Sequence, residues 1–230
     1  LLPDDVPLRA QAMRLLVADG DFAKAILLGE RSPADARIVT YLGISYSRSE
    51  RLSDARRILG PYVHEHFEPY VKAYVEWWPA AKSMEERLWT SLRDGTAEQA
   101  LVRRLNSLPQ HQANEEAEAW VRARMAADPY LSQLCQTLRQ HEDVYPAASE
   151  LAMILLREGL SIPKGEKRRE RLVEAERVFL DLRKINDKDP HQDLQLGQVY
   201  FWLGRETAGQ ELFDKLEKEA DGHVLTSMGE

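Results

Sequence analysis

Apolar residues recur along almost the whole chain at intervals of three and four residues, which is the period of a helix with one buried face. No segment shows the strict alternation of apolar and polar residues that marks a β-strand. Short helices joined by short turns pack as antiparallel neighbours, so we expect an all-α chain of about six to seven helical hairpins. The expected helices cover residues 7–19, 22–31, 33–48, 52–60, 67–78, 84–93, 97–107, 114–127, 129–141, 146–158, 167–185, 190–203 and 207–220.

Local signals set these boundaries. A capping side chain before a proline marks a helix start, because the proline there needs no hydrogen-bonded N–H. This signal occurs at Ser32-Pro33, Asp128-Pro129 and Asp189-Pro190. Two further starts are predicted from capping boxes at Ser83-Met84-Glu85-Glu86 and Thr96-Ala97-Glu98-Gln99. Breaks between paired helices are predicted at Asp19-Gly20 and Asp94-Gly95.

Two blocks of sequence share the pattern Leu-Gly-x-x-Tyr. The first block is Leu42-Gly43-Ile44-Ser45-Tyr46, followed by Ala55 and Leu59, and the second is Leu196-Gly197-Gln198-Val199-Tyr200, followed by Gly209 and Phe213. In both blocks a small residue stands 12 positions after the first glycine and a large apolar residue 16 positions after it. Small residues let two helices approach closely where they cross, and large residues fill the space beside the crossing.

These blocks resemble the tetratricopeptide repeat, a helical hairpin of about 34 residues. The resemblance is best over residues 33–62 and 190–220, whereas residues 63–145 have the pattern of irregular helical pairs. It implies a single right-handed superhelical solenoid over residues 1–230. The chain begins without methionine, and residues 224–229 are similar to the opening of another first helix, so we expect a fragment of a longer protein.

The resemblance also implies a concave groove, lined by the first helix of each repeat, in which a peptide or a partner helix binds. The corresponding positions here are Arg37, Thr40, Ile44, Ser47, Arg48, His191, Leu194, Gln198, Phe201 and Trp202. Such a groove is basic at one end and aromatic at the other. The alternative for Trp202 is burial against the helix that starts near Thr207. The Lys and Asn clamp of chaperone-binding relatives is absent from these positions, which disfavours that role.

Other clusters have both a structural and a functional interpretation. The aromatic residues around Trp77 and Trp78 favour packing between hairpins, although the two cannot both face a core, and the exposed one is a candidate partner contact. The run from Lys164 to Arg171, with Lys167, Arg168 and Arg169 as secondary candidates, indicates either a solvated helix start or a docking patch. His64-Glu65-His66 favours exposed turn histidines over a metal site, since two residues apart on a helix do not face each other.

Composition narrows the function classes. The formal net charge of -7 makes nucleic-acid binding an unfavoured expectation, because such proteins gather positive charge. No apolar run is long enough to span a bilayer, so we expect a soluble protein of the cytoplasm or periplasm. The single cysteine, Cys135, excludes an intramolecular disulfide and is expected to be a buried structural thiol. Arginine outnumbers lysine, which is typical of a GC-rich bacterial genome.

No nucleophile with its base, no phosphate-binding loop and no metal-ligand spacing is visible, so we expect neither an enzyme nor a cofactor or metal. The leading hypothesis is a non-catalytic scaffold that binds a protein or peptide. Two alternatives stay open: a module of a bacterial envelope or exopolysaccharide-export assembly, and a regulatory or nucleic-acid-binding module that uses the basic run.

Overall fold

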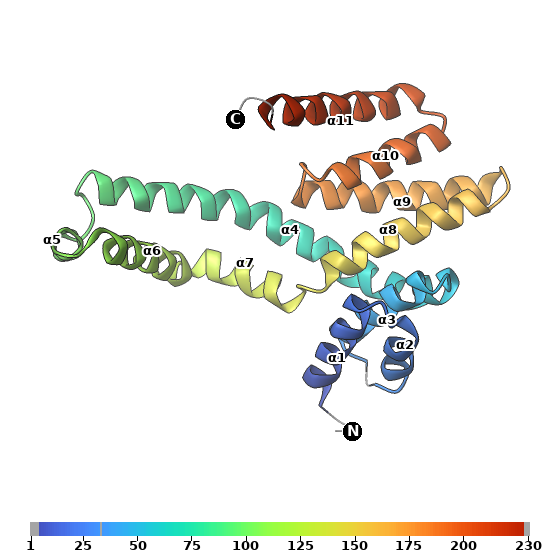
Figure 1. The fold of residues 1–230 in the computed structure, drawn as a ribbon, viewed down its shortest axis with the longest axis horizontal. Coiled ribbons are helices and arrows are strands. Elements are labelled where there is room, and N and C mark those ends of the chain that lie inside the picture. Colours follow the sequence, from blue (N-terminus) through green and yellow to red (C-terminus); the bar gives the residue numbers. More distant parts are fainter. Residues whose placement is uncertain (1–4, 33, 228–230) are drawn as a thin grey trace. The chain divides into compact units, whose positions relative to one another are not determined.

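The computed structural model describes residues 5–32 and 34–227, with side chains as far as Lys218. Within these residues the chain forms eleven α-helices and no β-strand, which confirms the all-α class (Figure 1). The helices are α1 (Val6–Ala18), α2 (Phe22–Glu30), α3 (Ala36–Arg48), α4 (Leu52–Arg93), α5 (Gln99–Ser107), α6 (Gln110–Ala127), α7 (Pro129–Gln140), α8 (Val144–Ser161), α9 (Glu166–Ile185), α10 (Pro190–Trp202) and α11 (Glu206–Ser227).

The chain folds into two compact units, where the sequence analysis expected one array. The first unit contains Leu1–Val71 and His141–Glu230, and the second contains Lys72–Gln140. The chain leaves the first unit within α4 and returns to it just before α8. The second unit is therefore an insertion in the sequence of the first.

Helix α4 is 42 residues long and corrects three predictions at once. It joins the expected helices at 52–60, 67–78 and 84–93, and the predicted capping box at Ser83 is wrong because this residue lies inside the helix. Proline usually interrupts a helix, since it removes one hydrogen bond and its ring crowds the preceding turn. Here all three prolines of α4 are solvent-exposed: Pro61, Pro69 and Pro79.

The opposite face of α4 explains why the helix continues. Ala55, Leu59, Val63, Phe67 and Val71 follow one another at intervals of four residues, and all five are buried. A continuous helix keeps this stripe on one face, whereas a break at Pro61 or Pro69 would turn its later half away from the core. Burial of the stripe offsets the hydrogen bonds lost at the prolines.

The remaining helix signals have mixed outcomes. Asp128 accepts a hydrogen bond from the Leu131 amide at 2.9 Å, and Asp189 accepts one from the His191 amide at 3.0 Å, so both caps are confirmed. The capping box at Thr96 is wrong, since α5 begins at Gln99 without a side-chain cap.

Pro33 lies outside the described residues, and α3 begins three residues later than expected, capped by Asp35. The breaks at Gly20 and Gly95 are confirmed by their left-handed backbone, with φ of 76° and 67°. The predicted new helix at residues 224–229 is not present at Val224 to Ser227, because these residues continue α11.

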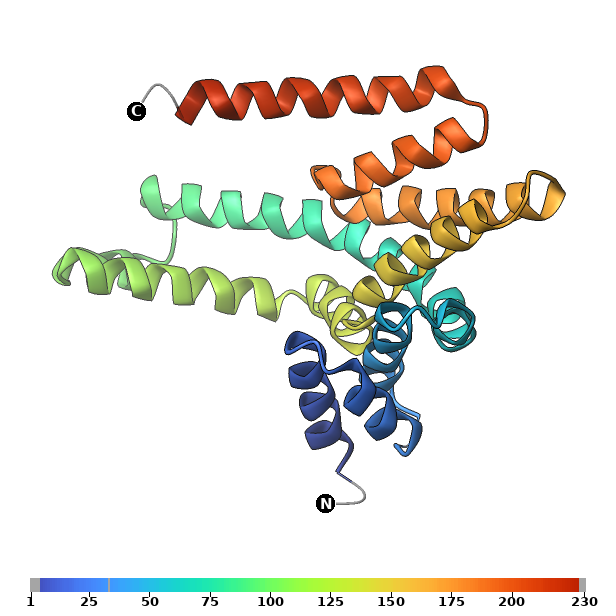
Figure 2. The same cartoon turned by 45° about the vertical axis from the view of Figure 1, so that its right-hand side comes forward.

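The first unit is a set of neighbouring helical pairs. Helices α1, α2 and α3 pack on one another, α8 packs on α9, α9 on α10, and α10 on α11 (Figure 2). Helix α3 also packs on α8, although about a hundred residues separate them in the sequence. One apolar cluster runs through this unit from Met13 of α1 to Val199 of α10.

The close helix approaches expected at the Leu-Gly-x-x-Tyr blocks are present. A Cβ atom added at Gly43 would lie 2.3 Å from Leu59 Cγ, and one added at Gly197 would lie 2.5 Å from Phe213 Cε1. Both distances are far below van der Waals contact, so each site accepts only glycine without movement of its neighbour. In both blocks, the large residue 16 positions after the glycine is the one that fills the space.

Salt bridges link helices α9, α10 and α11 of the first unit. Asp193 of α10 is 2% exposed and lies between Arg183 of α9 and Lys215 of α11, each 2.8 Å from one of its carboxylate oxygens. Glu176 of α9, also buried, pairs with Arg205 in the turn before α11. Three helices are thus joined through one buried carboxylate.

The second unit has a thin core of small residues. Its buried apolar side chains are Ala73, Ala81, Ala97, Ala117, Val121 and Leu131. The hydroxyl of Tyr130 on α7 donates a hydrogen bond to Glu76 on α4 at 3.1 Å, and Arg104 of α5 pairs with Glu116 of α6 at 2.6 Å. Polar contacts at the surface therefore supplement a core that buries little apolar area. In the part of the chain that the structure describes, no helix is both long and apolar enough to cross a membrane.

A histidine pair stands where the chain returns to the first unit. His66 of α4 and His141, just after α7, stack with ring centroids 4.9 Å apart, and the Tyr62 ring meets His66 edge-on at 5.0 Å. His64 and His66 were expected in an exposed turn, but both lie in α4, where only His64 is exposed. Burial, together with the neighbouring His66, lowers the pKa of His141 below its ordinary value of 6.5.

Acidification is expected to weaken the folded state through His141. A lowered pKa in the folded chain means that the unfolded chain binds the proton more tightly, so stability is complete above pH 6.5 and falls as the pH drops through the folded pKa. Urea unfolding between pH 8 and pH 5 measures this loss. His141→Gln is expected to reduce the slope of stability against pH in this range, and an unchanged slope would contradict the assignment to His141.

Candidate functional site

The α3 part of the expected groove is largely covered by α8. The hydroxyl of Thr40 lies 3.2 Å from the backbone carbonyl of Asp143, and Ser47 donates a hydrogen bond to Glu150 at 2.5 Å. Both Thr40 and Ser47 are buried, at 0% and 1% exposure. The expectation that these two residues face an open groove is therefore wrong, because the face of α3 that carries them is the one on which α8 packs.

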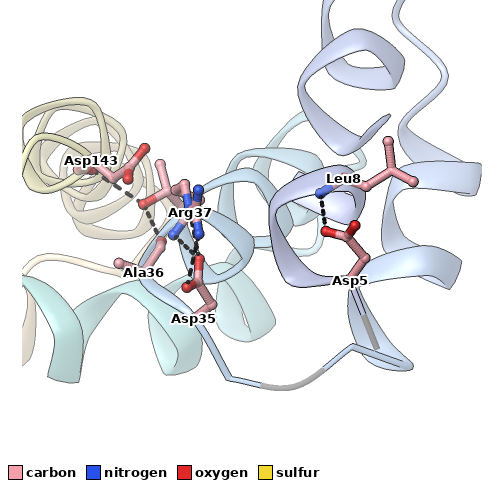
Figure 3. Close-up of polar contacts among 7 residues, drawn as sticks. Asp5, Leu8, Asp35, Ala36, Arg37 and Asp143 are labelled. Atoms are coloured by element: carbon pink, nitrogen blue, oxygen red, sulfur yellow. Dashed lines mark hydrogen bonds and ion pairs between the residues drawn. The ribbon is translucent and has the colours of Figure 1, made fainter. Parts of the chain in front are cut away.

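Internal ion pairs neutralise the arginines of α3. Figure 3 shows Arg37 beside Asp35, with the Arg37 Nε atom 3.1 Å from Asp35 Oδ1, and the carbonyl of Asp143 on the neighbouring element. The hydrogen bond from Arg37 holds the pKa of Asp35 below its usual value. Arg48 lies 3.5 Å from Glu150, and Ile44 is half-buried. This end of the expected groove thus offers a partner little free charge and no open apolar face.

Helix α10 has the more open surface. Leu194, Phe201 and Trp202 are exposed at 38%, 39% and 51%, His191 is exposed and Gln198 is half-buried. Phe201 stacks on Phe213 of α11, with ring centroids 5.5 Å apart. The alternative in which Trp202 buries against α11 is wrong. Two aromatic rings are therefore held at the C-terminal end of α10 while remaining accessible.

The basic run lies beside these rings. The guanidinium carbon of Arg168, near the start of α9, stands 4.5 Å from the centroid of the Trp202 ring, a cation–π geometry. Arg168 and Trp202 line one open pocket of about 520 Å³. Its other lining residues are Lys164, Gly165, Arg169, Leu172, Phe201, Leu203 and Gly204. Two features that the sequence presents separately thus form one surface.

We call this region the basic–aromatic surface and define it as Lys164, Arg168, Arg169, Phe201 and Trp202. All the charged residues that line the pocket are positive, and no acidic residue lines it. Over the described residues, the side chains of Lys164, Lys167, Arg168 and Arg169 form no salt bridge, whereas Arg171 pairs with Glu158 and Glu174. The basic–aromatic surface therefore presents positive charge that the fold leaves uncompensated.

The start of α9 adds to this positive potential. Glu166 opens the helix and Gly165 precedes it, so no side chain caps the first amide groups. Uncapped N–H groups form the positive end of the helix dipole, and Lys167, Arg168 and Arg169 are unfavourable there. The basic residues thus reduce helix stability slightly, and among the described residues no salt bridge to Lys167, Arg168 or Arg169 offsets this cost.

The tryptophan pair of the second unit has only one exposed member, as predicted. Trp78 is 52% exposed and stacks on Tyr74 with ring centroids 6.3 Å apart. Trp77 is half-buried and lines a pocket of about 830 Å³ with Leu131, Cys135 and residues of α6. Cys135 is free and half-buried, so it is less enclosed than the expected structural thiol. Among the described residues, no group of three or more His, Cys, Asp or Glu side chains is placed to hold a metal ion.

No protein family, curated protein or solved structure matches this chain. Function is therefore inferred from the arrangement of its own residues.

Proposed function

We propose that this protein is a non-catalytic scaffold that binds a partner protein through the basic–aromatic surface. The observation that carries this proposal is the exposed Trp202 ring, held beneath Arg168 and bordered by cations without acidic partners. Trp, Tyr and Arg are enriched among the residues that dominate the binding energy of protein interfaces, and ordering such side chains on binding costs conformational entropy. Trp202 and Arg168 restrain each other, so part of that cost is met before a partner arrives.

The scaffold itself is proposed to be a tetratricopeptide-like array with one interruption. Four successive pairs form it: α1 with α2, α3 with the first part of α4, α8 with α9, and α10 with α11. The packing of α1 on α3 and of α3 on α8 supports this arrangement, because first helices of successive repeats pack on one another in helical-repeat proteins. The close approaches at Gly43 and Gly197 support it further. In sequence, the second unit is inserted between the second and third pairs.

Replacing Trp202 by alanine tests the binding surface. We expect Trp202→Ala to reduce capture of the partner at least about tenfold, since a central aromatic anchor is lost. The measurement is a quantitative pull-down from an extract of the native cells, with the folded state of each variant checked by circular dichroism. Trp78→Ala is the matched control, because Trp78 is equally exposed but lies in the second unit.

The pull-down has two informative outcomes for the role of the basic–aromatic surface. Proteins retained by the wild type and by Trp78→Ala but lost by Trp202→Ala would identify the partner and support the proposal. Equal recovery of the same proteins by all three would remove the basic–aromatic surface from the function.

A further inference from the structure

The basic–aromatic surface is specific enough to indicate the chemistry of its partner. We infer that it binds an acidic polypeptide segment in which a large apolar or aromatic side chain stands among aspartates and glutamates. This inference rests on the proposed function and narrows it to one class of partner.

The charge of the pocket favours an acidic partner. The protein carries a net charge of -7, yet no acidic side chain lines this pocket, and Lys164, Arg168 and Arg169 do. Elsewhere in the first unit most cations are paired, as Arg171 is with Glu158. Unpaired cations cost a free protein little in water, but they attract carboxylates strongly, and arginine binds them with two parallel hydrogen bonds. An acidic segment is complementary to this surface, whereas the remainder of the chain repels it.

The shape of the pocket favours a segment that carries one large apolar side chain. The pocket of about 520 Å³ has apolar walls from Phe201, Trp202 and Leu203, and two glycines, Gly165 and Gly204, also line it. Pockets of roughly 300–1,000 Å³ accommodate compact apolar groups. A purely acidic segment would leave these walls in contact with water. A segment that inserts one leucine or aromatic side chain would cover them and bring its flanking carboxylates to the cations at the rim.

The position of Arg168 and the glutamates of α9 favour a polypeptide over a nucleic acid. Single-stranded nucleic acid binds by stacking bases on exposed aromatic rings along a basic groove. Here Arg168 already lies over the Trp202 ring, so a base would compete with it for that face. Glu166 and Glu170 alternate with the cations of α9 and would repel a continuous phosphate backbone. Carboxylates spaced along a peptide can avoid these two positions.

Binding of defined probes tests the inference. Fluorescence anisotropy would compare four labelled probes with the full chain: an acidic peptide with a central Leu-Phe pair, the same peptide with Ser-Gly at the centre, a Leu-Phe peptide with lysines in place of the acids, and a single-stranded oligouridylate. We expect the acidic Leu-Phe peptide to bind at least about tenfold more tightly than each of the others. Its affinity is expected to fall between about 50 mM and about 200 mM salt, because surface charges are screened.

Charge reversal supplies the matched variants. Lys164→Glu/Arg169→Glu is expected to weaken binding of the acidic Leu-Phe peptide at least about tenfold. Arg14→Glu/Lys188→Glu makes the same change in net charge at exposed sites outside the pocket and is expected to bind as the wild type does. An equal loss in both variants would overturn the inference, because net charge alone would then explain it.

The remaining outcomes are also decisive. Tighter binding of oligouridylate than of any peptide would replace the polypeptide partner with nucleic acid. Equal binding of both acidic peptides would remove the apolar anchor, and self-association of the chain abolished by Lys164→Glu/Arg169→Glu would make a second copy the occupant. If no peptide binds while Trp202→Ala still loses the partner from cell extract, this inference fails and the proposed function stands.

Discussion

Replacing Arg183 and Lys215 together by methionine is expected to lower the free energy of unfolding by about 3–5 kcal/mol. Asp193 is 2% exposed, and these two side chains are its charged partners, one from α9 and one from α11. Methionine keeps much of their apolar volume, so the main change is a carboxylate left buried without a cation. Burial of an unpaired charge is among the most destabilising changes a single site can undergo.

A third substitution separates this charge effect from a loss of packing. Adding Asp193→Asn to the double variant removes the stranded charge at nearly constant volume, and we expect it to restore most of the lost stability. Urea unfolding of the wild type, the double variant and the triple variant measures the differences in the free energy of unfolding. Arg57→Met is the surface control, because its pair with Asp54 is exposed to solvent and screened, so its loss is expected to leave stability nearly unchanged. A double variant as stable as the wild type would show that Asp193 is not held by these partners.

Alanine at Gly43 is expected to destabilise the protein by about 1–3 kcal/mol, while alanine at Gly60 is expected to change its stability by less than about 1 kcal/mol. Both glycines lie inside helices. A Cβ atom at Gly43 would stand 2.3 Å from Leu59 Cγ, whereas one at Gly60 would meet no atom of another helix within 4 Å. Gly60 is instead followed directly by Pro61, whose ring crowds the Cβ atom of a preceding helical residue. At Gly60 the gain in helix propensity is opposed by the restriction that Pro61 places on the residue before it, whereas at Gly43 the same gain is overcome by a steric clash between two helices.

The thermal or urea unfolding midpoints of the two variants check this contrast. Leu59→Val, introduced with Gly43→Ala, is expected to relieve part of the clash, so the double variant should be more stable than the sum of the single effects implies. Equal changes at Gly43 and Gly60 would contradict the close approach of α3 and α4.

Local signals predicted much of the secondary structure. The helix expected at 167–185 is observed at Glu166–Ile185, and the Asp128 cap lies where the sequence placed it. The prolines of α4 were misleading, because their effect depends on the face of the helix on which they lie. That face is decided by the burial of Leu59, Val63 and Phe67 against the first unit, a tertiary interaction that local sequence does not contain.

The individual residues of the candidate site could be predicted from the sequence, but their proximity in space could not. The sequence singled out Arg168 in a basic run and Trp202 in an aromatic pair, yet only the packing of α9 on α10 places them 4.5 Å apart. Thr40 and Ser47 failed as groove residues for the converse reason, since α8, which covers them, follows about a hundred residues later. Asp193 was missed because an acid near the start of a helix has an ordinary role with the helix dipole.

The insertion of the second unit has a consequence for how the protein folds. Packing of α3 on α8 requires closure of the segment Lys72–Gln140, which costs about 4 kcal/mol of chain entropy if that segment is a random coil. Within the second unit Tyr130 of α7 contacts Glu76 of α4, and within the first unit His66 of α4 stacks on His141. A contact between α4 and α7 that forms first would shorten the loop left to close and would lower this entropy cost. The contact between α3 and α8, although distant in sequence, would then close a shorter effective loop during folding.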